Sequence, residues 1–290
     1  MHFKVKNFYT FLYKLIFCKN FFKFFNSKFT FEIDFNKRIK NKGIFRDIAD
    51  CIIFGSLSKE KEEKIFLDVG ANMGEFGKRI ELYFGKEVFY IEPNPFIFPY
   101  LLTNIPNKKK AFKFAISDKN TQKSFYFSPK HTGGGSLHFS DIGHSKILVK
   151  CITLDNFFKK INVKKKVCAV KLDIEGHEIA ALNGAKKLIK KFRPLFIVEL
   201  TDSKNFHILK SILVNYKYYY VSIPGLDFNK SLILRLWGLF KTIISKKGYF
   251  LEYNNKIGFV SGLICIPIEK HSKCIFNLKN FFINDLDLLA

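Results

Sequence analysis

The chain has 290 residues, nearly half of them apolar, which is enough for a full hydrophobic core and excludes a disordered chain. Its 17 glycines, eight prolines and six cysteines exclude collagen-like repeats and disulfide scaffolds. The 49 basic and 25 acidic residues give a net charge of +24, which suits anionic partners. The abundance of Phe, Lys, Ile and Asn, however, indicates AT-rich codons as the main source of the excess Lys.

The first 31 residues are basic and aromatic, with ten Phe, six Lys and no acidic residue. Lysines interrupt the apolar runs, so the segment lacks the core of a secretory signal and the roughly 20 apolar residues of a membrane span. Apolar positions between Phe8 and Phe22 have near-helical spacing. This predicts a helix that either packs on the domain or lies on an anionic membrane surface. We expect a cytoplasmic protein, with peripheral contact at the inner membrane surface as an open alternative.

From residue 64 onward, short apolar runs alternate with segments of helical period, which predicts βαβ units and a parallel sheet. The expected strands are Lys64–Val69, Glu87–Glu92, Ala111–Ile116, Val167–Asp173 and Leu195–Leu200. The expected helices are Gly74–Phe84, Pro95–Asn104, Gly176–Lys190 and Ser203–Asn215.

Four further strands are predicted beside this core. Lys123–Ser128 and Ile147–Ile152 flank a glycine-rich turn, whereas Tyr218–Ile223 and Leu263–Ile268 can pair antiparallel at the edge of the sheet. The stretch between the last two is aromatic, basic and irregular, which predicts an insertion. The chain therefore divides into a basic aromatic N-terminal helical region (1–60), a core (61–225), and an insertion with the last edge strand and a C-terminal tail (226–290).

The first predicted strand ends in a glycine-rich turn of the form Asp68-x-Gly70-x-x-x-Gly74. Such glycines let the backbone approach a ligand closely and turn into a helix whose free N–H groups face that ligand. The spacing is not GxGxxG and no GK[ST] follows, which argues against a dinucleotide site or a P-loop. An acid at the strand end, Asp68, suits an ammonium-bearing ligand better than a pyrophosphate.

Carboxylates also follow the next two strands. Glu92 ends the second strand at the spacing from Asp68 where a carboxylate meets both ribose hydroxyls of a nucleoside. The third strand ends in Ser117 and Asp118, whose side chains can accept a hydrogen bond from the exocyclic amine of adenine. Together these residues predict a bound nucleoside.

These motifs occur in a fixed order along the chain: Phe66–Gly74, Ile91–Pro95, Ala115–Asp118, Thr153–Asp155, Lys171–Glu178 and Ile197–Leu200. In this order they resemble the FkbM-type S-adenosylmethionine-dependent methyltransferases. The Asp-Ile-Glu-Gly-x-Glu element is the most specific piece, whereas the Asp-Val-Gly-Ala-Asn element is shared by many methyltransferases. The resemblance extends from about residue 65 to residue 200.

The resemblance implies an α/β protein of the Rossmann-like class I type, with a mostly parallel seven-stranded sheet and helices on both faces. It implies S-adenosylmethionine as cofactor and places Glu92 at its ribose, Asp118 at its adenine, and Asp173 near the reacting methyl. The residues expected near its methionine portion are Asp68, Gly70, Ala71, Asn72 and Gly74. Members of the family are associated with O-methylation of sugars, polysaccharide precursors and polyketides.

The acceptor side is predicted at the end of the fourth strand, where Asp173, Glu175 and His177 alternate. If this segment is extended, the three side chains point together at the sheet edge where ligands bind in α/β proteins. An alcohol acceptor must lose a proton, and a neutral histidine is a suitable base near pH 7. We therefore assign His177 as the base and Asp173 as the residue that orients the acceptor, with Asp173 or Glu175 as alternative bases. Glu178 would begin or cap the following helix.

Metal binding is not predicted. His131, His138 and His144 flank the glycine-rich segment Thr132–Leu137, but their spacing matches no standard zinc site, and we expect a mobile loop that closes on the ligands. Glu199, at the end of the fifth strand, could pair with a basic residue such as Arg193. Asp173 and Glu199 could also bind Mg²⁺, which stays an open alternative.

The predicted function is O-methylation of a hydroxyl on a sugar, polysaccharide or glycolipid precursor. RNA is the first alternative acceptor, favoured by the charge but not by any RNP, KH or OB signature, so a nucleic-acid partner is not expected. A non-catalytic cofactor-binding adaptor at a membrane surface is the second, and the complete set of edge acids argues against it. The oligomeric state is not predicted.

Overall fold

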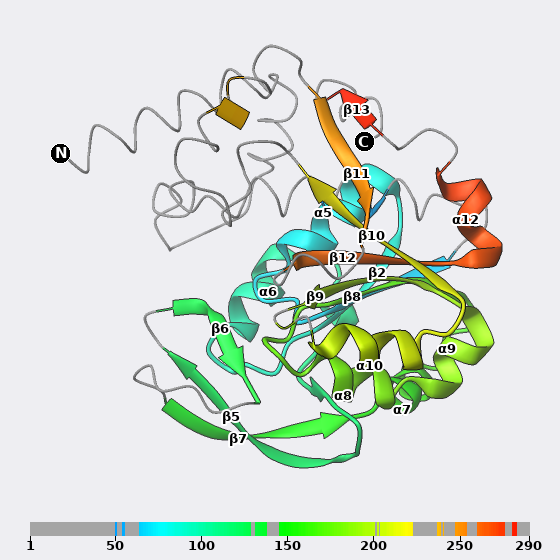
Figure 1. Ribbon diagram of the computed structural model, residues 1–290. Coiled ribbons are helices and arrows are strands. Elements are labelled where there is room, and N and C mark those ends of the chain that lie inside the picture. The colour runs from blue at the N-terminus through cyan, green and yellow to red at the C-terminus, as the bar shows by residue number, and fades with distance from the viewer. Residues whose placement is uncertain are drawn as a thin grey trace.

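The computed structural model describes residues 50, 54–55, 64–128, 131–137, 145–200, 202, 204–222, 237–238, 240, 247–253, 260–275 and 280–282. Within them the chain forms two β-sheets, and helices pack around the larger one (Figure 1). The helix predicted between Phe8 and Phe22 lies outside these residues. No helix in the described part is long and apolar enough to cross a membrane.

The larger sheet has nine described strands in the order β13-β11-β10-β12-β9-β8-β1-β2-β3. Their bounds are β1 Lys64–Val69, β2 Glu87–Ile91, β3 Ala111–Phe112, β8 Lys166–Leu172, β9 Leu195–Leu200, β10 Tyr216–Ser222, β11 Lys247–Glu252, β12 Val260–Pro267 and β13 Asn280–Phe282. The five strands from β3 to β9 are parallel, whereas β12 runs antiparallel to both of its neighbours. The antiparallel pairing expected near the end of the chain is therefore confirmed.

This sheet is mixed, so the expected mostly parallel seven-stranded sheet is correct only in part. The additional strands are β11, which lies in the stretch predicted to be irregular, and β13 from the C-terminal tail. Both extend the sheet by antiparallel pairing. β11 joins because the buried ring of Phe250 stacks on Tyr219 of β10, with 4.8 Å between the ring centroids. Aromatic residues that show no regular spacing in the sequence thus give β11 an apolar face toward β10.

The smaller sheet has the order β4-β7-β5-β6, with β4 Ala115–Ile116, β5 Thr121–Ser128, β6 His131–Ser136 and β7 Ser145–Ile152. The single strand expected over Ala111–Ile116 is wrong, because β3 pairs with β2 while β4 pairs with β7 of the other sheet. The glycine-rich segment is a strand rather than a loop. Gly135 allows this, since a Cβ there would lie 2.5 Å from the ring of Phe125.

The described helices are α5 Glu75–Phe84, α6 Phe98–Asn104, α7 Leu154–Ile161, α8 Glu178–Asn183, α9 Lys186–Phe192, α10 Lys204–Ile212 and α12 Ile268–Ile275, with a 3₁₀ turn at Lys108–Lys110. Figure 1 shows α7 to α10 below the large sheet and α5 on its other side, so helices cover both faces as expected. The predicted helix Gly176–Lys190 divides into α8 and α9 near Gly184, which packs closely on the end of β4: a Cβ there would lie 2.2 Å from the carbonyl oxygen of Ser117.

The central strands are buried on both faces. Side chains such as Leu67, Val170 and Phe196 have no exposed surface, as continuous apolar runs in a parallel sheet require. Polar residues gather where these strands end. The sheet therefore provides a rigid apolar base for a polar edge at the carboxyl ends of β1, β2 and β8.

Candidate active site

The turn after β1 has an unusual backbone. Three of its residues have positive φ angles, namely Gly70 at 74°, Asn72 at 49° and Gly74 at 86°. The N–H groups of Gly70 and Ala71 donate to the carbonyl oxygen of Ile91 at 3.0 Å, and a Cβ on Gly70 would lie 1.8 Å from the carbonyl oxygen of Asp173. The turn is therefore packed between the ends of β2 and β8, and it requires glycine at position 70.

Asp68 supports this turn from below. Its side chain is fully buried, with Oδ2 accepting a hydrogen bond from the N–H of Gly77 at 2.9 Å and Oδ1 lying 3.5 Å from Nζ of Lys171. Burial raises the pKa of the Asp68 carboxyl. These contacts let Asp68 organise the turn. A direct contact between Asp68 and a ligand's ammonium stays a prediction.

Lys171 connects the two halves of the site, and our sequence analysis gave it no role. Its Nζ lies 3.1 Å from Asp173 Oδ2 and donates to the carbonyl oxygen of Gly70 at 3.1 Å, in addition to the contact with Asp68. Burial alone would lower the pKa of Lys171, but the charges of Asp173 and Asp68 outweigh it and raise the pKa. A lysine within a buried strand needs such partners, and that was the available signal.

Glu92 is buried directly beside the turn. Its Oε2 accepts from the N–H of Asn72 and its Oε1 from the N–H of Asn94, both at 2.8 Å. Burial raises the pKa of this carboxyl to about 7, although the two hydrogen bonds act in the opposite direction. Each oxygen keeps a second lone pair for further donors such as hydroxyl groups.

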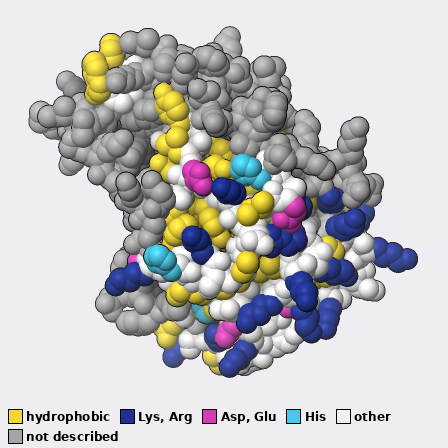
Figure 2. Space-filling model, turned by 45° about the vertical axis from the view of Figure 1, so that its right-hand side comes forward, with side chains coloured by type: hydrophobic (Ala, Val, Ile, Leu, Met, Phe, Trp, Pro, Cys, Tyr) yellow, Lys and Arg dark blue, Asp and Glu magenta, His cyan; other side chains and the backbone are white. Residues whose placement is uncertain are grey.

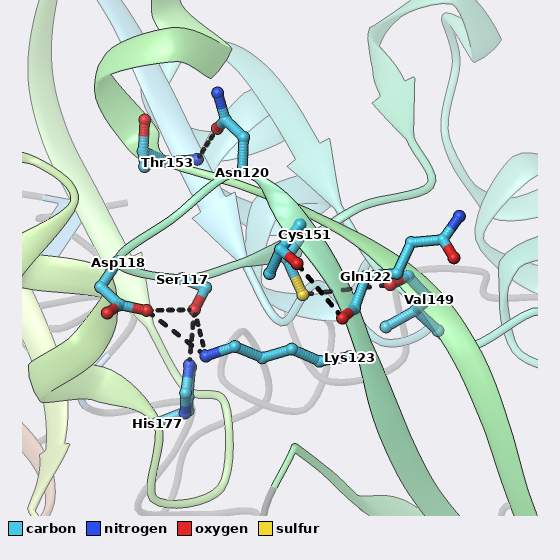
Figure 3. A network of polar contacts seen from close by, with 10 residues as sticks. Ser117, Asp118, Asn120, Gln122, Lys123, Val149, Cys151, Thr153 and His177 are labelled. Atoms are coloured by element: carbon cyan, nitrogen blue, oxygen red, sulfur yellow. Dashed lines mark hydrogen bonds and ion pairs between the residues drawn. The ribbon is translucent and has the colours of Figure 1, made fainter.

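Ser117, Asp118, Lys123 and His177 form a polar network where β4 ends (Figure 3). Ser117 Oγ donates to Asp118 Oδ1 at 2.9 Å, accepts from Lys123 Nζ at 2.9 Å, and lies 3.0 Å from Nε2 of the His177 ring. The hydrogen bond from Ser117 is the main reason why the pKa of Asp118 is lowered. The structure thus links the expected adenine residues to the expected base.

The segment after β8 is a tight turn, so it is not extended, as it would have to be for Asp173, Glu175 and His177 to point together. Glu175 and Gly176 have φ angles of 53° and 92°, which reverse the backbone. Glu178 holds this turn, because its Oε1 accepts from the N–H groups of Ile174 at 3.0 Å and Gly176 at 3.2 Å. Glu178 also begins α8, as predicted. As a consequence, the buried His177 ring faces Ser117.

The acidic cluster consists of Asp173, Glu175 and Glu199, each of which has a carboxylate oxygen within 4.8 Å of the others. Burial, together with the charges of Asp173 and Glu178, raises the pKa of Glu175 to about 7. Burial and the nearby carboxylates of Asp173 and Glu175 raise the pKa of Glu199 to about 9. The cluster can therefore both hold and release protons near neutral pH.

The sequence left two alternatives for Glu199, a salt bridge with Arg193 and a metal site with Asp173. Arg193 is not the partner of Glu199, because its Nε pairs with Glu269 at 2.9 Å on α12. The three carboxylates could hold a divalent cation between them, which keeps open the alternative for Asp173 and Glu199.

Ser136 of β6 donates to the carbonyl oxygen of Glu175 at 2.7 Å, so the glycine-rich strand contacts the site. His138 and His144 lie outside the described residues.

The model of the methyltransferase FkbM domain matches residues 68–220, which is more than half of the chain. The chain belongs to the FkbM methyltransferase family. Members of this family use S-adenosylmethionine as their methyl donor. The buried carboxylate of Glu92 beside the turn, with lone pairs left for a diol, fits this cofactor.

The chain is 29% identical over 147 residues to the hexuronic acid methyltransferase AglP of Haloferax volcanii. The match covers 50% of this chain and 59% of the relative, so the chain spans somewhat over half of that protein. A crystal structure of methyltransferase FkbM from Methylobacillus flagellatus is 16% identical, with a TM-score of 0.36 over 70% of this chain and 43% of the other. The plantazolicin methyltransferase BamL is 11% identical, with a TM-score of 0.39 over 86% and 94%.

Proposed function

We propose that this FkbM methyltransferase transfers the methyl group of S-adenosylmethionine to a hydroxyl of a sugar acceptor. The observation that carries the proposal is the acidic cluster, which stands next to the turn assigned to the cofactor and contains carboxyls that can accept a hydroxyl proton at neutral pH. The name of the hexuronic acid methyltransferase among the relatives supports a sugar as acceptor.

The cofactor would lie along the edge formed by the turn after β1 and the ends of β2 and β4. Glu92 would accept hydrogen bonds from the ribose hydroxyls, while Ser117 and Asp118 would meet the adenine. The residues from Asp68 to Gly74, namely Asp68, Gly70, Ala71, Asn72 and Gly74, would hold the methionine portion. This order is supported by Asp68, which lies near the end of β1, and by Glu92 and Asp118, which follow β2 and β4.

Glu175 is the base in this proposal, in place of His177. When bound, S-adenosylmethionine supplies a methyl group on a good, neutral leaving group, so alignment and removal of the hydroxyl proton are the protein's tasks. A carboxyl with a pKa of about 7 is matched to that proton transfer. Lys171 holds Asp173 in place, so Asp173 orients the acceptor. Glu199, whose pKa is raised to about 9, would be protonated at neutral pH and would offer a hydrogen-bond donor to the acceptor.

The test is methyl transfer in vitro to a panel of acceptors. Purified protein with isotopically labelled S-adenosylmethionine is offered uronic-acid-containing oligosaccharides, neutral oligosaccharides and total RNA. Label on an oligosaccharide that survives mild alkali is the expected result, because a methyl ether resists alkali and a methyl ester does not. Label only on RNA, or only as an alkali-labile ester, would overturn the proposal.

The same assay tests the base. Glu175→Gln keeps the shape of the side chain but cannot accept a proton, so we expect kcat to fall by about 100-fold with little change in cofactor affinity. Glu252→Gln on β11 is the matched control, because that carboxylate is exposed and pairs only weakly with Lys217 at 3.8 Å. Full activity of Glu175→Gln would remove this residue from the chemistry.

A further inference from the structure

The Ser117 hydroxyl lies at the centre of a network that joins the two sheets (Figure 3). Ser117 is fully buried, and its N–H donates to the carbonyl oxygen of Ile152 in β7 at 3.1 Å. It follows β4 of the smaller sheet, whereas His177 follows β8 of the larger one. The contact of 3.0 Å between Ser117 Oγ and His177 Nε2 therefore spans 60 residues of sequence and connects two loops at the cofactor edge.

The hydrogen-bond roles at Ser117 determine the state of the His177 ring. A serine hydroxyl has one proton to donate and two lone pairs that accept. The carboxylate of Asp118 only accepts and the ammonium of Lys123 only donates, so the hydroxyl proton goes to Asp118 and one lone pair goes to Lys123. The remaining lone pair must accept from His177, which means that Nε2 carries a hydrogen. That nitrogen has no lone pair with which to take a proton from an acceptor.

The loop that carries His177 is held firmly. Glu178 accepts two of its N–H groups, and Ser136 donates to the carbonyl oxygen of Glu175. His177 itself is only 7% exposed. Because the ring is fixed in this way, it holds the Ser117 hydroxyl at a fixed distance from the turn after β8. The hydroxyl proton of Ser117 in turn holds the carboxylate of Asp118.

Asp118 faces a cavity of about 510 Å³ at this point. The cavity is lined by Asp118, Gly176, His177, Ile179, Ala180, Asn183, Lys186 and Asn205. Only Oδ1 of Asp118 is engaged by Ser117 and Lys123, and no contact to Oδ2 is seen in the described part of the chain. Oδ2 is thus available to an amine, and Ile179 and Ala180 of α8 give the cavity an apolar wall. This combination suits a planar base with a polar edge.

We propose that His177 is a positioning residue, which fixes Ser117 and Asp118 for the adenine of the cofactor through its Nε2–H. This inference rests on the assignment of Asp118 to adenine in the proposed function. It does not depend on the acceptor. It predicts that loss of the ring weakens cofactor binding and leaves the chemical step intact.

The experiment measures binding of S-adenosylhomocysteine by calorimetry and the steady-state kinetics of His177→Ala, His177→Gln and wild type. We expect His177→Ala to raise the dissociation constant about tenfold, which is the effect of one lost buried hydrogen bond, with kcat at saturating cofactor within about twofold of wild type. His177→Gln retains an N–H donor and should recover most of the affinity. Because calorimetry needs no acceptor, a wrong sugar assignment does not affect this result.

A double-mutant cycle provides the second readout. Ser117→Ala breaks the same hydrogen bond from the other side, so His177→Ala/Ser117→Ala should bind S-adenosylhomocysteine about as weakly as Ser117→Ala alone. Ser117→Ala also serves where His177→Ala fails to fold. The proposal is overturned if the effects of the two substitutions simply add. It is equally overturned if His177→Ala keeps wild-type cofactor affinity but loses kcat together with a limb of the pH–rate profile near neutrality, which is the behaviour of a base.

Discussion

At the residue scale, Lys171 organises the site by pairing with Asp173, two residues along the chain, and with Asp68 on the neighbouring strand. Edge acids could be anticipated, because Asp68, Glu92 and Asp173 each end an apolar run. The direction of the His177 side chain could not be anticipated, because it depends on the positive φ angle of Glu175. Glutamate rarely has a positive φ angle, so no local sequence pattern predicts one there. The role of Lys171 was equally hidden, because it depends on the register that sets Lys171 opposite Asp68 on the neighbouring strand.

Lys171 provides the prediction at this scale. Lys171→Met removes a cation that lies between a fully buried carboxylate and Asp173, and we expect it to lower the free energy of unfolding by about 3–5 kcal/mol. The double variant Lys171→Met/Asp68→Asn no longer buries an unpaired charge at position 68 and should lose less. Urea denaturation measures both. A single variant as stable as wild type would contradict the bridging role.

At the scale of elements, apolar runs predicted the central strands well, because strands buried on both faces need little else. The predictions failed where the secondary structure depends on which strand is the pairing partner or on a single side-chain contact. The strand expected from Ala111 changes sheets after Phe112, and Gly135 makes room for a phenylalanine ring inside β6 instead of serving a loop. Helix α7 is only eight residues long and was not predicted, although Thr153 Oγ1 caps it by accepting from the N–H of Asn156.

Helix α7 can be tested through Phe157, which has no exposed surface and packs edge-on against Phe112 of β3 with 5.1 Å between ring centroids. Phe157→Ala should leave a cavity and cost about 3–5 kcal/mol of stability. Leu148→Ala on β7 is the control, because Leu148 is 71% exposed and its truncation should change stability by less than about 0.5 kcal/mol. Denaturant midpoints at an unchanged slope are the measurement. Equal losses for both variants would contradict the packing of α7.

At the scale of the whole molecule, basic side chains predominate on part of one face. Figure 2 shows Lys and Arg side chains over much of the described lower half of one face, with few acidic side chains between them. The matched family region, 68–220, contains the whole acidic cluster and the entire smaller sheet, whereas β11, β12 and β13 lie beyond it. The acidic cluster and the strands β11 to β13 therefore lie in separate stretches of this chain.

The buried acids give the whole protein a pH dependence with a definite sign. Glu92, Glu175 and Glu199 all have pKa values above their ordinary value of 4.5, because burial favours their neutral forms. Above that value the unfolded chain releases these protons while the folded protein retains them, so the unfolded state binds fewer protons and stability falls as pH rises. For Glu199 this loss extends from about pH 4.5 to its pKa of about 9. Below pH 4.5 both states are protonated and the cost disappears.

Glu199→Gln isolates this effect, since the amide has nearly the same shape and never ionises. We expect the variant and wild type to have similar melting temperatures at pH 5, and the variant to melt higher by about 2 °C or more at pH 8.5, where wild type must bury a charge or keep a proton at a cost. Glu252→Gln is the control, because it makes the same substitution at a side chain that is 63% exposed. Calorimetric scans between the two pH values give the comparison. A difference that is constant with pH would show that position 199 contributes through packing and not through its proton.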